Sequence, residues 1–143
     1  MSLQVRDTIT IDAPAAKVWE VLVNPVYVSQ WDELPEDYPQ DRMKLGDKVV
    51  WDLPNGQQSI TKLIKTEPNK ELVIALMVTT WEHQPEEGDV SYRYILEEGD
   101  NQTVLHITIG DFSLIKDGEM YYEESVKFAE ESKKVIKELA ENL

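Results

Sequence analysis

The sequence predicts an α+β fold in which a curved antiparallel sheet wraps around one long C-terminal helix. Three observations support this fold class. The chain opens on an alternating segment that leads directly into a short helical segment. Further alternating segments then follow one another through short turns. The chain ends in a stretch of about 25 residues with helical periodicity throughout.

The first predicted element is a half-buried strand. Its apolar side chains fall on one face of a period-two pattern, at Leu3, Val5, Ile9 and Ile11. Asp7 has the same parity and puts a charge on this face. We expect Asp7 either to mark a bulge at the strand edge or to reach as a polar group into a cavity.

Two short helices are expected next. Asp12 can cap the first helix, and Pro14 suits its first turn. Asn-Pro at residues 24–25 ends this helix, because the residue before a proline avoids helical angles. The segment "VYVSQW" then predicts a second helix ending at Trp31, and the acidic "DELPEDYPQD" after it is expected to be a loop.

A meander of about six strands is expected between the short helices and the last helix. "PNGQ" predicts a hairpin turn, because Asn-Gly readily adopts the positive φ angles of such turns. "LVIALMVTTW" is apolar on both faces, so its strand should be central or covered. We expect the first strand to close the sheet beside the last one.

The final element is an amphipathic helix from about Gly118 to Leu143. It contains no proline and no further glycine, and apolar or small residues recur at three- and four-residue steps. Such a helix needs an apolar surface, which the meander offers. The predicted arrangement is a helix grip, with the short helices at one end of the sheet.

Several segments also match the pattern of a known family. They are "TITIDAPAAKVWEVL", "NPVYVSQW", Gly46 before a strand, "EPNKELVIAL", "SYRYILEEGDNQTVLHITIGDF" and the long helix. With them, nearly the whole chain resembles the START-like (SRPBCC) superfamily and, within it, the heat-shock-protein ATPase activator homologues. The resemblance implies one START-like domain over residues 1–143 and a deep pocket between sheet and helix.

What the family resemblance implies about function is open. Its members bind lipids, modify polyketides or contact chaperones, and a fold does not fix a function. Members often carry a polar residue, commonly His, near the end of the last strand. Here that region reads "ITIGDF", so we expect a pocket drier than the family norm.

Strand alternation predicts which side chains would line that pocket. An apolar cavity with a few hydroxyl groups is an ordinary small-molecule site. The alternative is that the same side chains simply fill the space. We expect Trp31 near the mouth. The candidate ligand-binding residues are Trp31, Trp51, Leu63, Leu76, Tyr92, Tyr94, Leu105, Ile107, Ile109, Tyr121, Ser125 and Phe128.

No catalytic residue, cofactor or metal ion is predicted. His83 lies in a polar connection, and His106 alternates with apolar residues and so points away from the pocket. Two histidines on different elements form neither a triad nor a metal site. The absence of cysteine excludes disulfides, thiolate catalysis and cysteine-ligated zinc.

The net charge of −14 disfavours binding to nucleic acid or to an anionic membrane surface. No apolar run approaches the ~20 residues of a membrane-spanning helix, and the N-terminal segment is polar. We therefore expect no membrane insertion and a cytoplasmic location.

The function that the sequence favours is binding of a small apolar or aromatic molecule. One alternative is a protein-interaction module of the chaperone ATPase activator type, which would meet a protein partner through its acidic surface. The other is a cyclase-like enzyme that uses Tyr92 or Tyr94 as an acid.

Overall fold

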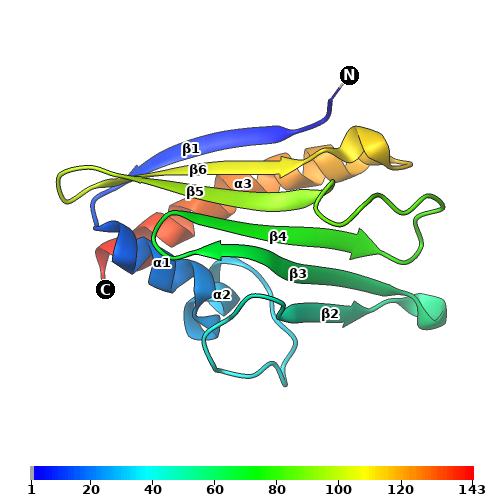
Figure 1. Ribbon diagram of the computed structural model, residues 1–143, viewed down its shortest axis with the longest axis horizontal. Coiled ribbons are helices and arrows are strands. Elements are labelled where there is room, and N and C mark those ends of the chain that lie inside the picture. The colour runs from blue at the N-terminus through cyan, green and yellow to red at the C-terminus, as the bar shows by residue number, and fades with distance from the viewer. Residues whose placement is uncertain (1) are drawn as a thin grey trace.

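The computed structural model describes residues 2–143; Met1, the first residue of the predicted domain, lies outside them. A sheet of six antiparallel strands has the order β1-β6-β5-β4-β3-β2. Figure 1 shows α3 running along one face of this sheet, with α1 and α2 at one end. The strands are β1 (Val5–Ile11), β2 (Lys48–Asp52), β3 (Gln58–Glu67), β4 (Glu71–Val78), β5 (Ser91–Glu98) and β6 (Thr103–Gly110). The helices are α1 (Ala15–Val23), α2 (Pro25–Trp31) and α3 (Gly118–Glu141), with single turns of 3-10 helix at Pro54–Gly56 and Phe112–Leu114.

The predicted α+β helix-grip fold is confirmed. The first strand lies beside the last one, as expected, and β4 is an interior strand. The "PNGQ" segment does join β2 to β3, with Asn55 and Gly56 at positive φ angles of 64° and 76°. The meander itself contains five strands, β2 to β6, and β1 supplies the sixth strand of the sheet.

Asp7 does not mark a bulge. The pairing of β1 with β6 runs without interruption from Val5↔Ile109 to Ile11↔Thr103. Asp7 instead accepts a hydrogen bond of 2.8 Å from the Lys133 ammonium group of α3. This hydrogen bond is the main reason why the pKa of Lys133 is raised. The charge on the apolar face is thus compensated by a cation on the helix that covers it.

The expectation that Asp12 caps the first helix is also wrong. Helix α1 begins at Ala15, and Pro14 occupies the cap position without a side-chain hydrogen bond. The Ala15 N–H donates instead to the Glu98 carboxylate at 2.8 Å. Because β5 ends close to the start of α1, a residue 83 positions away in the sequence satisfies the first helical donor.

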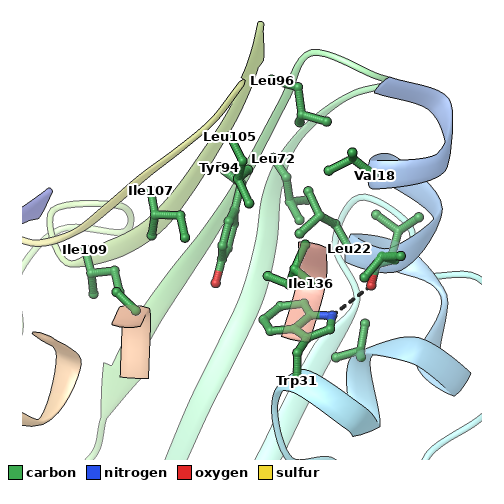
Figure 2. Close-up of a cluster of buried hydrophobic side chains, with 14 of the residues drawn as sticks. Val18, Leu22, Trp31, Leu72, Tyr94, Leu96, Leu105, Ile107, Ile109 and Ile136 are labelled. Carbon is green, nitrogen blue, oxygen red and sulfur yellow. Dashed lines mark hydrogen bonds between the residues drawn. The ribbon is translucent and has the colours of Figure 1, made fainter. Parts of the chain in front are cut away.

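One helix covers only part of the concave face. An α-helix is about 10–12 Å wide and strands lie about 4.8 Å apart, so α3 can cover roughly half of a six-stranded sheet. Among the strands it lies closest to β1 and then to β6, and it also packs on α1 and α2. We call β1, β6 and their contact with α3 the helix-covered half. Figure 2 shows Leu105, Ile107, Ile109 and Ile136 within the buried cluster, and these side chains are at most 1% exposed.

The remaining strands are covered in a different way. Over the concave face of β2, β3 and β4 lie α2 and the loop of residues 32–47, and we call this region the loop-covered half. A bulge between Leu63 and Lys65 interrupts the β3–β4 register, and bulges bend a strand. At the bulge, the Leu63 carbonyl accepts a hydrogen bond from the Gly46 N–H at 2.8 Å, which fixes the end of the loop. β5 lies between the two halves.

Candidate ligand-binding site

A pocket of about 160 Å³ lies in the loop-covered half. For comparison, an engineered protein cavity of about 150 Å³ holds one benzene molecule. The pocket is therefore the size of one aromatic ring, with an opening to solvent. Its walls come from α1, α2, the loop after α2 and strands β2 to β5. They are formed by Leu22, Val28, Trp31, Asp32, Glu33, Leu34, Met43, Val49, Trp51, Ser59, Thr61, Leu63, Ile74, Leu76, Tyr92 and Tyr94.

Aromatic rings form much of the deep wall. Trp31 is only 6% exposed, and its indole N–H donates to the Val21 carbonyl at 2.8 Å, which fixes the ring. The ring of Tyr94 meets that of Trp31 edge to face, with centroids 5.8 Å apart. Figure 2 shows these two side chains approaching one another from β5 and α2. Behind this wall, Phe128 of α3 packs edge to face on Tyr92 with centroids 6.0 Å apart.

The mouth lies between Trp51 and the residues after α2. Trp51 is 39% exposed, and Asp32 and Glu33 are exposed lining residues as well. The expectation that Trp31 stands near the mouth is therefore wrong. Its hydrogen bond to Val21 holds it against α1, and Trp51 on the edge strand β2 takes the outer position.

Asp32 is the charged group with the most unusual environment in the pocket. It follows the last residue of α2, and its carboxylate accepts a hydrogen bond of 2.8 Å from the Glu33 N–H. Burial among protein atoms raises its pKa to about 6, even though the Glu33 N–H acts in the opposite direction. The side chain is nevertheless accessible, as expected of a group that projects into an open pocket.

The pKa values of the two pocket tyrosines are shifted by the same surroundings. Burial raises the pKa of both Tyr92 and Tyr94 above the ordinary value, and the negative charge of Asp32 raises it further. Both phenols are therefore neutral hydrogen-bonding groups at any physiological pH. They are also weaker acids than an exposed tyrosine, which disfavours them as proton donors in a cyclase-like reaction.

Half of the predicted ligand-binding residues surround the pocket. Those that line it are Trp31, Trp51, Leu63, Leu76, Tyr92 and Tyr94. Whether they bind a ligand stays a prediction.

The other six residues lie elsewhere. Leu105, Ile107 and Ile109 face inward as predicted, but α3 packs directly on this half of the sheet and fills the space. Phe128 supports the aromatic wall from behind, and Ser125 is buried on α3.

Tyr121 belongs to a separate aromatic cluster. It stacks on Phe112 with centroids 5.9 Å apart, and its hydroxyl accepts a hydrogen bond from the Trp81 indole at 3.3 Å. Trp81, in the connection after β4, thus fixes the first turns of α3 and leaves Tyr121 away from the pocket.

Four polar lining residues, Asp32, Glu33, Ser59 and Thr61, were not predicted from the sequence. Ser59 and Thr61 share the inward parity of Leu63, so the alternation that identified Leu63 also identifies them. Asp32 was assigned to a loop, although it directly follows Trp31. With these residues, the pocket has polar groups on β3 and directly after α2, on the side of the sheet away from β6. That the pocket is drier than the family norm stays a prediction.

The histidines have the predicted positions. His83 is exposed in the connection between β4 and β5, and His106 faces outward on β6 beside Glu97. Across residues 2–143, no group of three or more His, Cys, Asp or Glu side chains could hold a metal ion. Over the same residues, no helix combines the length and the apolar character needed to cross a membrane.

Comparison with known proteins now identifies the family. Residues 12–143 match the family model described as Activator of Hsp90 ATPase homolog 1-like protein. The chain belongs to this family. The resemblance to the START-like superfamily is thereby confirmed, and a search of curated proteins finds no match.

Solved structures support the fold of this family member. Protein MLL2253 from Mesorhizobium loti superposes with a TM-score of 0.70 at 16% identity, over 97% of both chains. The Aha1 dimer from Colwellia psychrerythraea gives a TM-score of 0.56 at 19% identity, over 90% of this chain and 96% of that one. DynU16, from the dynemicin biosynthetic locus, gives 0.68 at 17% identity, over 96% of this chain and 47% of that one. At these identities the similarity concerns the fold.

Proposed function

We propose that this protein binds a small, mainly apolar or aromatic molecule in the pocket of the loop-covered half. The observation that carries the proposal is the combination of a ring-sized space, aromatic walls and a few polar groups that converge on it. Small-molecule sites have this composition. No residue of α3 lines this pocket, so its place differs from the pocket between sheet and long helix that the family resemblance implies.

The volume of the pocket limits the size of the ligand. About 160 Å³ suits a one-ring molecule, or a two-ring molecule that extends through the mouth. Long fatty acids and polycyclic compounds would need the loop of residues 32–47 to move. We therefore expect one-ring aromatics to bind without rearrangement of the backbone.

Thermal unfolding with small neutral aromatics tests the proposal, with 2-phenylethanol and indole as probes. A ligand at 100 times its Kd stabilises the folded state by about 2.7 kcal/mol. For a chain of this size, the Tm should rise by roughly 5 °C or more. In NMR spectra, the amide shifts caused by the probe should centre on α2, β3 and β5.

A matched pair of variants separates pocket binding from surface binding. Leu76→Phe adds volume inside the pocket, whereas Met77→Phe adds it at the next position, which is exposed on the other face of β4. We expect Leu76→Phe to weaken binding at least tenfold and Met77→Phe to leave it within about twofold. If no probe stabilises the protein, the proposal fails and the protein-interaction alternative becomes the better explanation.

Catalysis is a second candidate function, and Asp32 is the observation in its favour. A carboxyl group with a pKa of about 6 can exchange protons near neutral pH, as a general acid or base must. The test is the mass of the bound compound after prolonged incubation. A binding protein returns the compound unchanged, whereas an enzyme converts it, and Asp32→Asn should then abolish conversion.

A further inference from the structure

We propose that the pocket selects small organic ammonium ions over carboxylates of the same size. This inference rests on the proposed function and specifies the charge of the ligand. Three features of the pocket carry it: the distribution of charges around it, the aromatic wall and the open side of the Asp32 carboxylate.

The pocket has negative charges and no positive ones. Asp32 and Glu33 line its mouth, and none of the described lining residues is Lys, Arg or His. A carboxylate ligand would therefore enter a partly desolvated site without a counter-ion and beside two like charges, which is strongly unfavourable. Long fatty acids are therefore disfavoured by charge as well as by volume, and small carboxylates by charge alone.

Strand alternation explains why cations are missing from the pocket. The lining residues Val49, Thr61 and Leu63 alternate with lysines, which therefore point to the outer face of the sheet. Lys62 pairs there with Glu87 at 3.2 Å. On the covering side, Arg42 of the loop after α2 pairs with Glu20 of α1. Lys62 and Arg42 are thus directed away from the pocket.

The aromatic wall provides a favourable environment for a cation. Ammonium ions are attracted to the faces of Trp and Tyr within about 6 Å of the ring centroid. Two Trp and two Tyr side chains line this pocket, and the centroids of Trp31 and Tyr94 are 5.8 Å apart. Aromatic side chains arranged around a cation are a known way to bind quaternary ammonium compounds.

Asp32 supplies the matching acceptor. Its Oδ1 atom accepts the hydrogen bond from Glu33, whereas no hydrogen bond joins Oδ2 to another of the described residues. Glu33, Tyr92 and Tyr94 are the titratable groups that face it, and none of them is a cation. An ammonium group in the pocket would donate to Oδ2 and neutralise the carboxylate. Charge-assisted hydrogen bonds of this kind are about twice as strong as neutral ones.

Three compounds of nearly equal size and shape test the inference: 2-phenylethylammonium, 2-phenylethanol and phenylacetate. Their Kd values are measured by calorimetry or NMR titration at pH 7.5 and pH 5. At pH 7.5 we expect the ammonium ion to bind about tenfold more tightly than the alcohol, and phenylacetate to bind more weakly than both. At pH 5, where Asp32 is mostly protonated, the ratio of ammonium to alcohol affinity should fall to threefold or less.

Two variants assign the preference to Asp32. Asp32→Asn should bring the ratio of ammonium to alcohol affinity close to one at both pH values. Asp37→Asn removes one negative charge from the same loop at an exposed position outside the pocket lining, and should leave the ratio unchanged.

The outcomes distinguish the inference from the proposed function. If the alcohol binds but the ammonium ion is not preferred, or if phenylacetate binds best, the ammonium inference is wrong and the ligand-binding proposal stands. A preference that falls equally in Asp37→Asn and in Asp32→Asn would show only the general acidity of the protein, and it would also overturn the inference. If none of the three compounds binds, both proposals fail.

Discussion

In both halves of the sheet, apolar side chains alternate onto the inner face. One half has a closely packed interior, whereas the other has an open pocket. In the helix-covered half, Leu105, Ile107 and Ile109 are at most 1% exposed and pack against α3. In the loop-covered half, Ile74 and Leu76 have the same inward orientation but line an open pocket. The pattern of side chains is similar in both, so the difference comes from what lies over them.

This difference shows how the fold creates a pocket. A long helix can bring a continuous apolar stripe to the strands beneath it, and close packing follows. Beyond the width of that helix, a loop that contains two prolines and six acidic residues within residues 32–47 has few apolar side chains to insert. The unfilled volume therefore lies under the loop, and the polar groups of the site lie at its mouth.

Among the changes that test this difference between the two halves, removing α3 should disturb the folded structure most. A chain that ends at Asp117 exposes the inner face of the helix-covered half, so we expect it to be insoluble or to lack fixed tertiary structure. A chain that ends at Glu141 retains the whole helix and serves as the control. The measurement is the dispersion of amide resonances. Dispersed spectra from the shorter chain would show that α3 is not required for the packing of the sheet.

Replacing one isoleucine in each half by alanine should give the next largest effect, a loss of stability that differs between the two halves. Ile107→Ala leaves a cavity in a closely packed region, and we expect it to lower the free energy of unfolding by about 2–5 kcal/mol. Ile74→Ala only enlarges an existing pocket, so we expect a loss of about 1–2 kcal/mol. Urea denaturation of both variants provides the comparison. Equal losses would contradict the distinction between a packed half and an open half.

The strength of the sequence signals explains how much of this fold could be predicted. The period-two segments, "PNGQ" and the uninterrupted last helix are local patterns, and they were sufficient for the topology. Contacts between distant residues were harder to predict. The pairing of Asp7 with Lys133 spans 126 residues, and the N–H of Ala15 is capped by Glu98 from the far end of β5. Local patterns contain no information about such partners.

The site was only partly predictable for a related reason. Alternation identifies the face of a strand on which a side chain lies, and it placed Trp51, Leu63 and Tyr94 correctly on the inner face. It does not show where along that face the covering helix ends. Ile107 and Leu76 therefore could not be distinguished. Asp32 was missed because its environment depends on how the loop folds back over the sheet. The periodicity of apolar residues does not indicate the path of a loop.

Replacing Asp32 should give the smallest change in the free energy of unfolding. This change should be an increase, whereas the isoleucine variants lower the free energy of unfolding. Burial raises its pKa from the ordinary 3.8 to about 6, so the folded state binds more protons than the unfolded state between these two pH values. The free energy of unfolding therefore falls as the pH rises through this window. Above pH 6 the full cost of holding a partly desolvated carboxylate is present, and below about pH 4 it is absent.

Asp32→Asn cannot ionise and should remove this cost. At pH 7 we expect the variant without ligand to be more stable than the parent protein by about 1 kcal/mol, a value reduced to allow for the access of solvent to the pocket. This corresponds to a rise in Tm of roughly 3 °C. The difference in Tm between variant and parent should decrease from pH 7 to pH 4, whereas Asp37→Asn should show no such trend. A difference that is independent of pH would mean that Asp32 is as well solvated in the folded protein as in the unfolded chain. The loop-covered half would then provide an open surface depression in place of a partly closed pocket.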